Sequence, residues 1–264
     1  MNFLTTILEQ KQKRLEAAKK LQPIEALKDM EWFHRETISL CDALARQQIG
    51  VIAEMKKASP SKGILRQQYD PVAIAKSYIM NGASAISVLT EEDFFSGNLE
   101  HLKAVRLSVL CPLLRKDFLT DSYELYEAKA YGADAVLIIV AACERSRLLD
   151  LLLEAKELGL EAVVEVHSIY ELEMLPSLSS ITLLGVNNRD LTTFAVDLTT
   201  ALRIKKEIPE HITLISESGI QRGSDIRMLY NEGIKNFLIG EAFMRATDPG
   251  VALRNLIDES RILL

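Results

Sequence analysis

One short segment, Glu54 to Gly63, carries the residue types that acid–base chemistry on a small molecule needs. It follows the apolar run 49–53 and reads Glu-Met-Lys-Lys-Ala-Ser-Pro-Ser-Lys-Gly. If the run is a strand that continues into this segment, residues two apart point to the same side, so Glu54 and Lys56 project together. A carboxylate and an ammonium at a strand end, followed by a loop with Ser59, indicate a reaction site. A surface ion pair beside a turn is the alternative.

Eight apolar runs rich in β-branched residues recur along the chain, and each would position one polar segment. Between them lie segments with helical apolar spacing, and several end in glycine, which suits a helix C-terminus. This alternation predicts a parallel sheet, and eight repeats favour an α/β fold of the closed (β/α)8 TIM barrel type. A doubly wound open sheet is the alternative, but no G-x-G-x-x-G follows the first run. The runs are residues 49–55, 85–89, 113–115, 135–140, 162–166, 181–186, 212–215 and 236–239.

The first 47 residues lie outside this alternation. Leucines recur there at helical spacing with basic residues between them, which predicts an exposed amphipathic helix, and a second short helix is expected after Pro23. We predict a helical extension over 1–47 that packs on a barrel formed by 48–264, rather than a partner-binding arm. The leucines are Leu4, Leu8, Leu15 and Leu21, and the basic residues are Lys11, Lys13 and Arg14.

Polar residues stand at most of the predicted strand ends. In a barrel of this kind the active site lies at the C-terminal ends of the strands, so these residues converge on one place. Separate surface ion pairs would not need to recur at the same end of successive strands. The residues are Glu54, Lys56, Lys116, Glu165, Asn187, Arg189, Glu217, Ser218 and Glu241.

The residue types at these ends indicate the chemistry. Two lysines and a glutamate from different strands suit acid–base catalysis at a carbonyl, or formation of a Schiff base. Gly219 and Gly240 follow the seventh and eighth strands, where such barrels often bind phosphate through backbone N–H groups. Phe94, Phe95 and Phe118 could line a flat apolar slot for an aromatic ring, although packing within a loop is the favoured interpretation of Phe94 or Phe95.

Several of these residues also have a purely structural interpretation. Lys116 could pair with its neighbour Asp117, and Glu165 with a nearby lysine, as in many ion pairs outside active sites. His167 is interpreted as structural, or as a support for the site. Taken together, however, the strand-end residues favour a single site.

Two of the carboxylates are expected to differ in proton affinity. Glu165 follows a strongly apolar segment, where desolvation favours the protonated form. Glu54 has Lys56 two residues on, and a neighbouring ammonium favours the ionised form. Such a pair suits a reaction with distinct proton-transfer steps.

Composition excludes several other classes of protein. The net charge of −6 and pI of about 5.4 argue against a nucleic-acid partner. Three scattered cysteines fit reduced thiols of a cytoplasmic protein, and the histidines show no metal-ligand spacing, so no metal is predicted. The longest apolar stretch, 135–143, is too short to span a membrane, and no signal peptide is evident. A monomer or weak homo-oligomer that binds a small molecule is expected.

Six segments, in chain order, resemble the strand-end motifs of the indole-3-glycerol phosphate synthase family. The resemblance runs from the N-terminal helices through the eighth strand. It implies a monofunctional carboxy-lyase of tryptophan biosynthesis, with the TIM-barrel fold and no redox cofactor or metal. The implied reaction is ring closure of 1-(2-carboxyphenylamino)-1-deoxyribulose 5-phosphate with loss of CO2 and water. The segments are residues 54–63, 87–97, 114–118, 185–191, 216–220 and 238–244.

The same resemblance implies roles for individual residues. Lys116 would be the general acid at the carbonyl. Glu165 would stabilise the cationic ring intermediate or move protons, and Glu54 would serve the dehydration. Lys56 would lie between the phosphate and the reacting oxygens, and Asn187 would orient the substrate. Substrate contacts are expected from Ser59, Phe95, Phe118, Arg189, Glu217, Ser218, Gly219, Gly240 and the backbone of Glu241.

Two other functions compete with this interpretation. A class I aldolase would use Lys116 as a Schiff-base lysine in a similar phosphate-binding barrel. A non-catalytic barrel would keep the pocket but lose a proton-transfer residue. The presence of Glu54, Lys116 and Glu165 together disfavours that second possibility.

Overall fold

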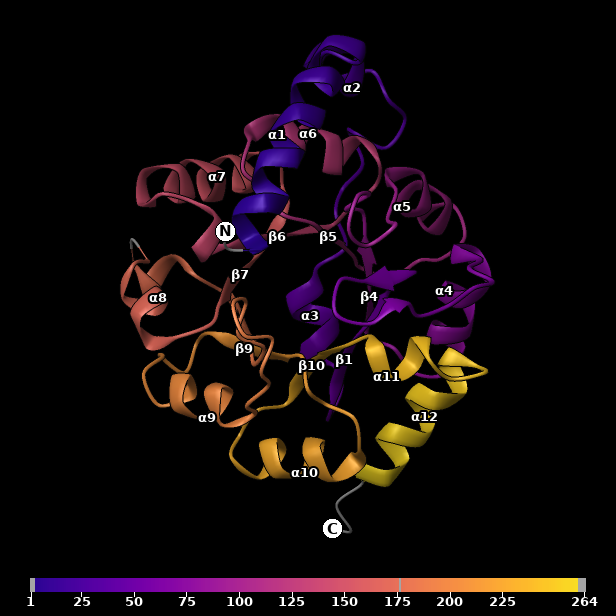
Figure 1. Ribbon diagram of the computed structural model, residues 1–264, viewed down its shortest axis with the longest axis vertical. Helices are drawn as coiled ribbons and strands as arrows, with labels where there is room; N and C mark the ends of the chain where they lie inside the picture. Colours follow the sequence, from indigo (N-terminus) through magenta and orange to yellow (C-terminus); the bar gives the residue numbers. More distant parts are fainter. Residues whose placement is uncertain (1–2, 176, 261–264) are drawn as a thin grey trace.

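The computed structural model describes residues 3–175 and 177–260, and its centre is a closed barrel of eight parallel strands (Figure 1). β1 pairs with both β4 and β10, which closes the sheet. This confirms the predicted (β/α)8 barrel, and the predicted runs differ from the strands by at most two residues at either end. The strands are β1 (Gly50–Met55), β4 (Ala85–Leu89), β5 (Leu113–Lys116), β6 (Ala135–Ile139), β7 (Glu161–Val166), β8 (Leu183–Asn187), β9 (Thr213–Glu217) and β10 (Asn236–Ile239).

Helices form a ring around these strands (Figure 1). Those from α4 to α10 connect one strand to the next, as the crossover between parallel strands requires, and α11 and α12 follow the last strand. Predicted glycines after four of the helices, such as Gly132 with φ 89° and Gly159 with φ 70°, have the left-handed backbone that ends a helix. The helices are α4 (Pro71–Met80), α5 (Leu99–Arg106), α6 (Ser122–Ala130), α7 (Arg145–Glu157), α8 (Ile169–Glu173), α9 (Thr199–Lys205), α10 (Gly223–Asn231), α11 (Glu241–Met244) and α12 (Pro249–Ser260), with 3-10 turns at Val140–Ala142 and Leu178–Ser180.

Alternation along the strands divides the apolar core into two layers. In β1, Val51 and Ala53 face the surrounding helices, whereas Ile52 faces the barrel interior with Leu114, Leu183 and others. Glu54 continues the inward face of Ile52, as the two-residue periodicity predicted. The barrel interior is therefore packed below the polar strand ends and forms a rigid floor beneath them.

A helix that the sequence analysis did not predict closes the opposite end of the barrel. α3 (Leu40–Ala45) inserts Leu40 and Leu44 into the interior cluster. Glu161 at the start of β7 accepts hydrogen bonds from the backbone N–H of Leu40 and of Cys41 and from the hydroxyl of Ser39. Because these carboxylate contacts satisfy the first N–H groups of α3, they fix this short helix in place.

The two predicted N-terminal helices are α1 (Phe3–Leu21) and α2 (Ile24–Lys28). Leu4, Ile7 and Leu15 form the buried stripe of α1, while Leu21 is exposed. Lys11, expected among exposed basic residues, lies on the same side as this stripe and points inward, because residues three or four apart share a helix face. The division of the chain at residue 47 stays a prediction.

The segment after β1 is more ordered than the predicted loop. It forms a small antiparallel hairpin from β2 (Ala58–Ser59) and β3 (Gly63–Ile64). Arg66, just after the hairpin, donates hydrogen bonds to the carbonyl groups of Ala246 and Thr247, which lie before α12. These bonds tie the segment to the far end of the chain.

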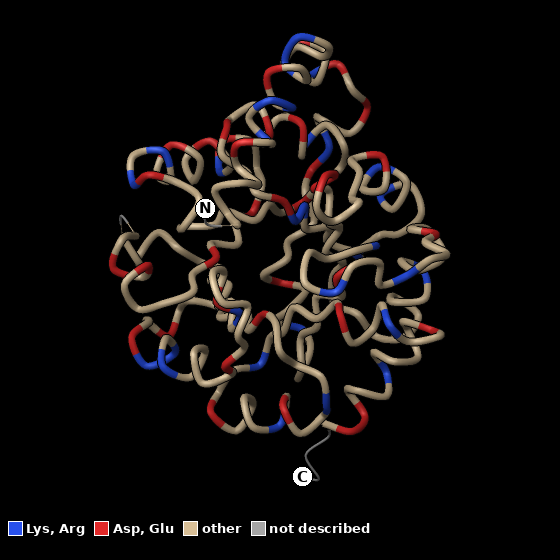
Figure 2. Tube along the Cα trace, in the orientation of Figure 1, with Lys and Arg blue, Asp and Glu red and all other residues tan. Residues whose placement is uncertain are grey.

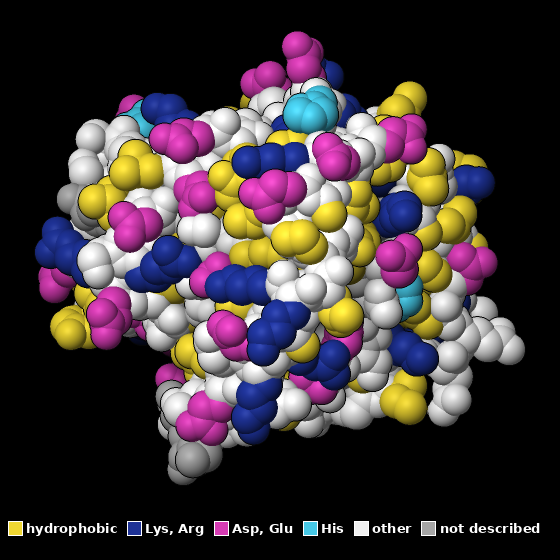
Figure 3. Space-filling model, turned by 90° about the horizontal axis from the view of Figure 1, so that it is seen from above, with side chains coloured by type: hydrophobic (Ala, Val, Ile, Leu, Met, Phe, Trp, Pro, Cys, Tyr) yellow, Lys and Arg dark blue, Asp and Glu magenta, His cyan; other side chains and the backbone are white. Residues whose placement is uncertain are grey.

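Charged residues occur both on the outer helices and around the central opening of the barrel (Figure 2). On the face shown in Figure 3, acidic and basic side chains are interspersed with hydrophobic ones. Within residues 3–175 and 177–260, no helix is both long and apolar enough to cross a membrane.

Candidate active site

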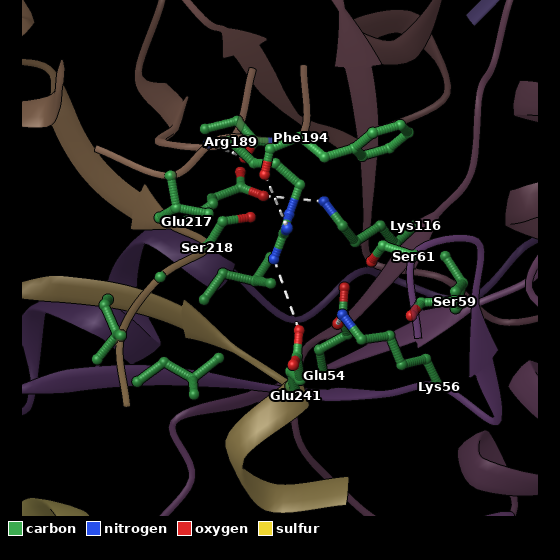
Figure 4. Close-up of a pocket in the computed structure, with 18 of the residues that line it drawn as sticks. Glu54, Lys56, Ser59, Ser61, Lys116, Arg189, Phe194, Glu217, Ser218 and Glu241 are labelled. Carbon is green, nitrogen blue, oxygen red and sulfur yellow. Dashed lines mark hydrogen bonds and ion pairs between the residues drawn. The ribbon is translucent and has the colours of Figure 1, made fainter. Parts of the chain in front are cut away.

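A single cavity of about 970 Å³ lies at the C-terminal ends of the strands, and every predicted site residue lines it. Side chains from β1, β5 and β9 point into it (Figure 4), and Glu165 of β7 and Asn187 of β8 also line it. Its volume is in the range of pockets that enclose a small ligand. The predicted residues brought together here are Glu54, Lys56, Ser59, Phe95, Lys116, Phe118, Glu165, Asn187, Arg189, Glu217, Ser218, Gly219, Gly240 and Glu241.

Lys116 lies between two buried carboxyl groups. Its Nζ is 2.8 Å from Oε2 of Glu217 and 3.2 Å from Oε2 of Glu165. Burial alone would lower the pKa of Lys116, but Glu217, Glu165 and Glu54 outweigh it and raise that pKa well above its usual range. The ammonium form is therefore strongly favoured at neutral pH.

The pKa values of the two carboxyl groups beside Lys116 are shifted in opposite directions. Burial, together with the negative charge of Glu165, raises the pKa of Glu217 to about 7, although Lys116 opposes this. Burial would also raise the pKa of Glu165, but Lys116, His167 and Asn187 reverse that effect and hold the pKa well below its usual range. The expectation that desolvation would favour protonated Glu165 is therefore wrong, because the sequence does not show how many cationic and donor groups surround this residue.

Glu54 and Lys56 project together at the end of β1, as predicted, and their side chains form an ion pair within the cavity. The buried Tyr78 of α4 donates a hydrogen bond of 3.1 Å to the backbone carbonyl of Glu54. A Cβ at Gly240 would lie 2.2 Å from Oε2 of Glu54, so the glycine leaves room for this carboxylate. Sequence analysis explained Gly240 by the approach of a phosphate, but in this structure the missing side chain also accommodates Glu54.

The backbone after β9 turns sharply at the cavity edge. Ser218 and Gly219 both have positive φ angles, 64° and 85°. The amide of Asn188 donates hydrogen bonds of 2.9 Å and 3.2 Å to the carbonyl groups of Glu217 and Ser218, which holds the turn in place. On the other side, Nη2 of Arg189 is 3.5 Å from Oε2 of Glu241 (Figure 4).

Phe95 and Phe118 form an apolar wall of the cavity, with ring centroids 6.0 Å apart. Buried Glu91 holds the loop that carries Phe95, because its carboxylate accepts hydrogen bonds from the N–H groups of Asp93, Phe94 and Phe95. Phe94 packs within the loops, as expected for one of this pair. Its ring lies 5.4 Å from that of Phe3 in α1.

Sequence analysis missed the contribution of the N-terminal helix to the cavity. Phe3, Leu4 and Ile7 line it, although they precede the first barrel strand by more than forty residues. The apolar residues at the start of α1 were visible in the sequence, but no local signal showed where they pack. Leu137 and Leu191 also line the cavity and were not predicted.

The alternative pairing of Lys116 with Asp117 does not occur. Asp117 comes just after β5 and contributes to the cavity lining, but its carboxylate turns away from Lys116 toward α1. Its Oδ1 is 2.6 Å from Nζ of Lys11, and its Oδ2 accepts a hydrogen bond of 2.6 Å from Thr90. Lys11 also lies 2.8 Å from Oε1 of Glu124, so α1 is bound directly to the segment that carries Lys116.

The chain matches the family model described as indole-3-glycerol phosphate synthase over residues 4–256. It is 45% identical over 263 residues to the indole-3-glycerol phosphate synthase of Carboxydothermus hydrogenoformans, covering 97% of this chain and 99% of that protein. It is also 45% identical over 260 residues to the enzyme of that name from Laribacter hongkongensis, covering 97% and 98%. Both matches span the predicted strand-end motifs.

Solved structures with little sequence similarity share the fold. 3-Hexulose-6-phosphate synthase from Salmonella typhimurium superimposes with a TM-score of 0.62 at 14% identity, covering 79% of this chain and 96% of that one. Thiamine phosphate pyrophosphorylase from Pyrococcus furiosus gives 0.59 at 16% identity, covering 81% and 96%. These likenesses show the barrel alone, whereas the match along nearly the whole sequence shows that the chain belongs to the indole-3-glycerol phosphate synthase family.

Proposed function

We propose that the chain converts 1-(2-carboxyphenylamino)-1-deoxyribulose 5-phosphate to indole-3-glycerol phosphate, as a carboxy-lyase of tryptophan biosynthesis. The observation that carries the proposal is the Lys116 ammonium, held between Glu165 and Glu217 where the cavity floor meets the apolar wall of Phe118. The aromatic carbon that bears the carboxylate attacks the ribulose carbonyl. Lys116, which is protonated at neutral pH, donates a proton to the oxygen as negative charge develops there.

Loss of CO2 and then of water completes the indole. Ionised Glu165 stabilises the positive charge on the ring that follows attack, and Asn187, whose amide lies 3.3 Å from Glu165, orients the substrate. Glu54 serves the dehydration as the second acid–base group, with Lys56 beside it. Both roles are supported by the contacts of these residues, because Glu165 pairs with Lys116 whereas Glu54 pairs with Lys56.

The two ends of the substrate find suitable surroundings in the same cavity. The anthranilate ring lies against Phe95 and Phe118, with Ser59 near its carboxylate. The phosphate lies at the ends of β9 and β10, at the backbone of Ser218, Gly219, Gly240 and Glu241, with Arg189 orienting the sugar. Such backbone turns at the seventh and eighth barrel strands are common phosphate sites.

The aldolase alternative is disfavoured by the charge around Lys116. A Schiff-base lysine must lose its proton to attack a carbonyl, and enzymes promote this by lowering the pKa. Here Glu217, Glu165 and Glu54 raise it.

The cytoplasmic location also remains part of the proposal, and is supported by the unpaired Cys41, Cys111 and Cys143.

The test is formation of the fluorescent indole product from the anilino-ribulose phosphate by the purified protein. We expect turnover without an added cofactor, and no covalent adduct after borohydride treatment in the presence of substrate. A borohydride-trapped lysine without indole formation would support the aldolase. Absence of both would support the non-catalytic barrel.

A further inference from the structure

His167 lies outside the cavity but contacts the active-site residue Glu165, and it has no role in the mechanism above. It follows the end of β7, and only 9% of its side chain is exposed. Its Nδ1 is hydrogen-bonded, at 3.1 Å, to Oε2 of Glu171 in α8. Its Nε2 is 3.3 Å from Oε1 of Glu165, close enough for an ion pair but without hydrogen-bond geometry. The ring therefore links a buried active-site carboxylate to a second carboxylate nearer the surface, of which 17% is exposed.

The local structure of α8 does not explain where this ring lies. Glu171 accepts a hydrogen bond of 2.8 Å from the backbone N–H of His167, and its own N–H donates to the hydroxyl of Ser168. These bonds cap α8 and would form with any side chain at position 167, because they use only its backbone. The two ion pairs of the imidazole are additional to the cap.

The charges around the ring favour its cationic form. Burial lowers the pKa of His167, but Glu165 and Glu171 outweigh this and raise it to about 10. The pKa of Asp190, on the segment after β8, is lowered mainly by hydrogen bonds from Thr193 and Thr192, and the charge of His167 adds a smaller effect. A histidine in this setting carries a fixed positive charge at neutral pH.

Glu165 and Glu217 differ chiefly in this contact. Both are buried, and both lie against Nζ of Lys116. Glu165 has the imidazole of His167 and the amide of Asn187 in addition. For Glu217, Oε1 has no hydrogen-bond partner among the described residues. One carboxyl is thus surrounded by groups that stabilise its anion, and the other is not.

We propose that His167 is a positioning residue for Glu165. Glu171 holds the imidazole ring of His167 in place, and the positive charge of the ring keeps Glu165 ionised. The exchangeable proton beside Lys116 then resides on Glu217. The consequence is a division of labour between the two carboxyls. Glu165 remains available to stabilise positive charge on the substrate ring, and Glu217 can return a proton to Lys116 after Lys116 has donated one. The inference rests on the proposed function, because it assigns a purpose to the ionisation of Glu165.

The test compares the pH dependence of kcat for the wild type and for His167→Gln, which keeps an amide donor but loses the charge. Removing an opposite charge at this distance should raise the pKa of Glu165 toward its ordinary value by about one unit or more. The kcat of the variant should therefore fall on acidification at a pH where the wild type is still fully active. KM should change little, because His167 does not line the cavity. His167→Lys restores a cation, and its kcat at acidic pH should return toward the wild-type value. His167→Asn replaces His167→Gln if the latter fails to fold.

Glu173→Gln is the matched control, because this exposed carboxylate lies on the same short helix. Its profile should coincide with that of the wild type. A His167→Gln profile that parallels the wild type at every pH, with kcat only scaled down, would show a structural role and overturn the inference. The wild-type assay separates the two claims: an inactive wild type removes the proposed function, whereas an active wild type with parallel profiles removes only the role of His167.

Discussion

At the scale of single residues, Glu217 differs most from an ordinary carboxylic acid. It is 1% exposed, and its pKa is raised to about 7 by burial and by the charge of Glu165. Between the unfolded and folded pKa values the folded state holds a proton that the unfolded state has lost, so this group lowers the free energy of unfolding as pH rises from about 4.5 to about 7.

Glu217→Gln removes this titration. We therefore expect the free energy of unfolding of the variant, relative to that of the wild type, to increase from about pH 5 to about pH 8, by up to about 3 kcal/mol. Denaturant unfolding of both proteins at the two pH values measures the change. Exposed Glu173→Gln should show no such trend, and a constant offset between Glu217→Gln and the wild type would contradict the assignment.

Glu165→Gln and Glu54→Gln should impair different steps. Glu165 lies beside Lys116, where ring closure begins, so its loss should slow ring closure and decarboxylation. Glu54 is paired with Lys56 instead, and its loss should slow the final dehydration. Single-turnover measurements that follow CO2 release and indole fluorescence separately distinguish the two. Equal delays in CO2 release, with no decarboxylated intermediate in either variant, would refute the division.

The sequence predicted which residues form the site, but not all of their contacts. The strand-end rule placed Lys116, Glu165 and Glu217 in one site, because parallel strands of a barrel end on the same side. The rule could not show that Asp117 turns toward Lys11, or that Lys116 outweighs the effect of burial on the pKa of Glu165. Those outcomes depend on partners from segments distant in the sequence.

At the scale of secondary-structure elements, α1 is joined to the site through a buried charge cluster. Lys11 pairs with Asp117 and Glu124, and both carboxylates are buried. Lys11→Met would remove the ion-pair partner of Glu124 and leave Asp117 with Arg115 alone, and breaking a buried pair costs about 3–5 kcal/mol. Turnover should also fall, because Asp117 directly follows Lys116 in β5.

Thermal or denaturant unfolding of Lys11→Met measures this contribution. Lys13→Met is the control, since Lys13 is exposed on the same helix. The same small effect of both substitutions on stability would contradict the proposed contribution of the Lys11 ion pairs.

The elements themselves were predictable to different degrees. The strands follow from continuous apolar runs, and the helix ends from glycines, both of which are local signals. Neither α3 nor the hairpin after β1 has such a signal. α3 has six residues and depends on Glu161 for its start, and the hairpin pairs only Ala58–Ser59 with Gly63–Ile64. Short elements of this kind form because tertiary contacts stabilise them.

At the scale of the whole molecule, the barrel places its polar groups at one end and closes the other with α3. We therefore expect sulfate or phosphate to bind at the ends of β9 and β10, around Gly219 and Gly240, with Lys56 nearby. Crystals soaked in either anion test this directly. Density for the anion only at the α3 end of the barrel would contradict the proposed orientation of the substrate.

The central claim is that Lys116 supplies the proton for ring closure, and indole formation by Lys116→Ala tests it most directly. Loss of one positioned general acid should lower kcat by about 100- to 10,000-fold. The fold should remain, as judged by circular dichroism, and exposed Lys206→Ala should keep wild-type activity. We predict a folded Lys116→Ala protein with almost no indole formation; indole formation near the wild-type rate would contradict the account.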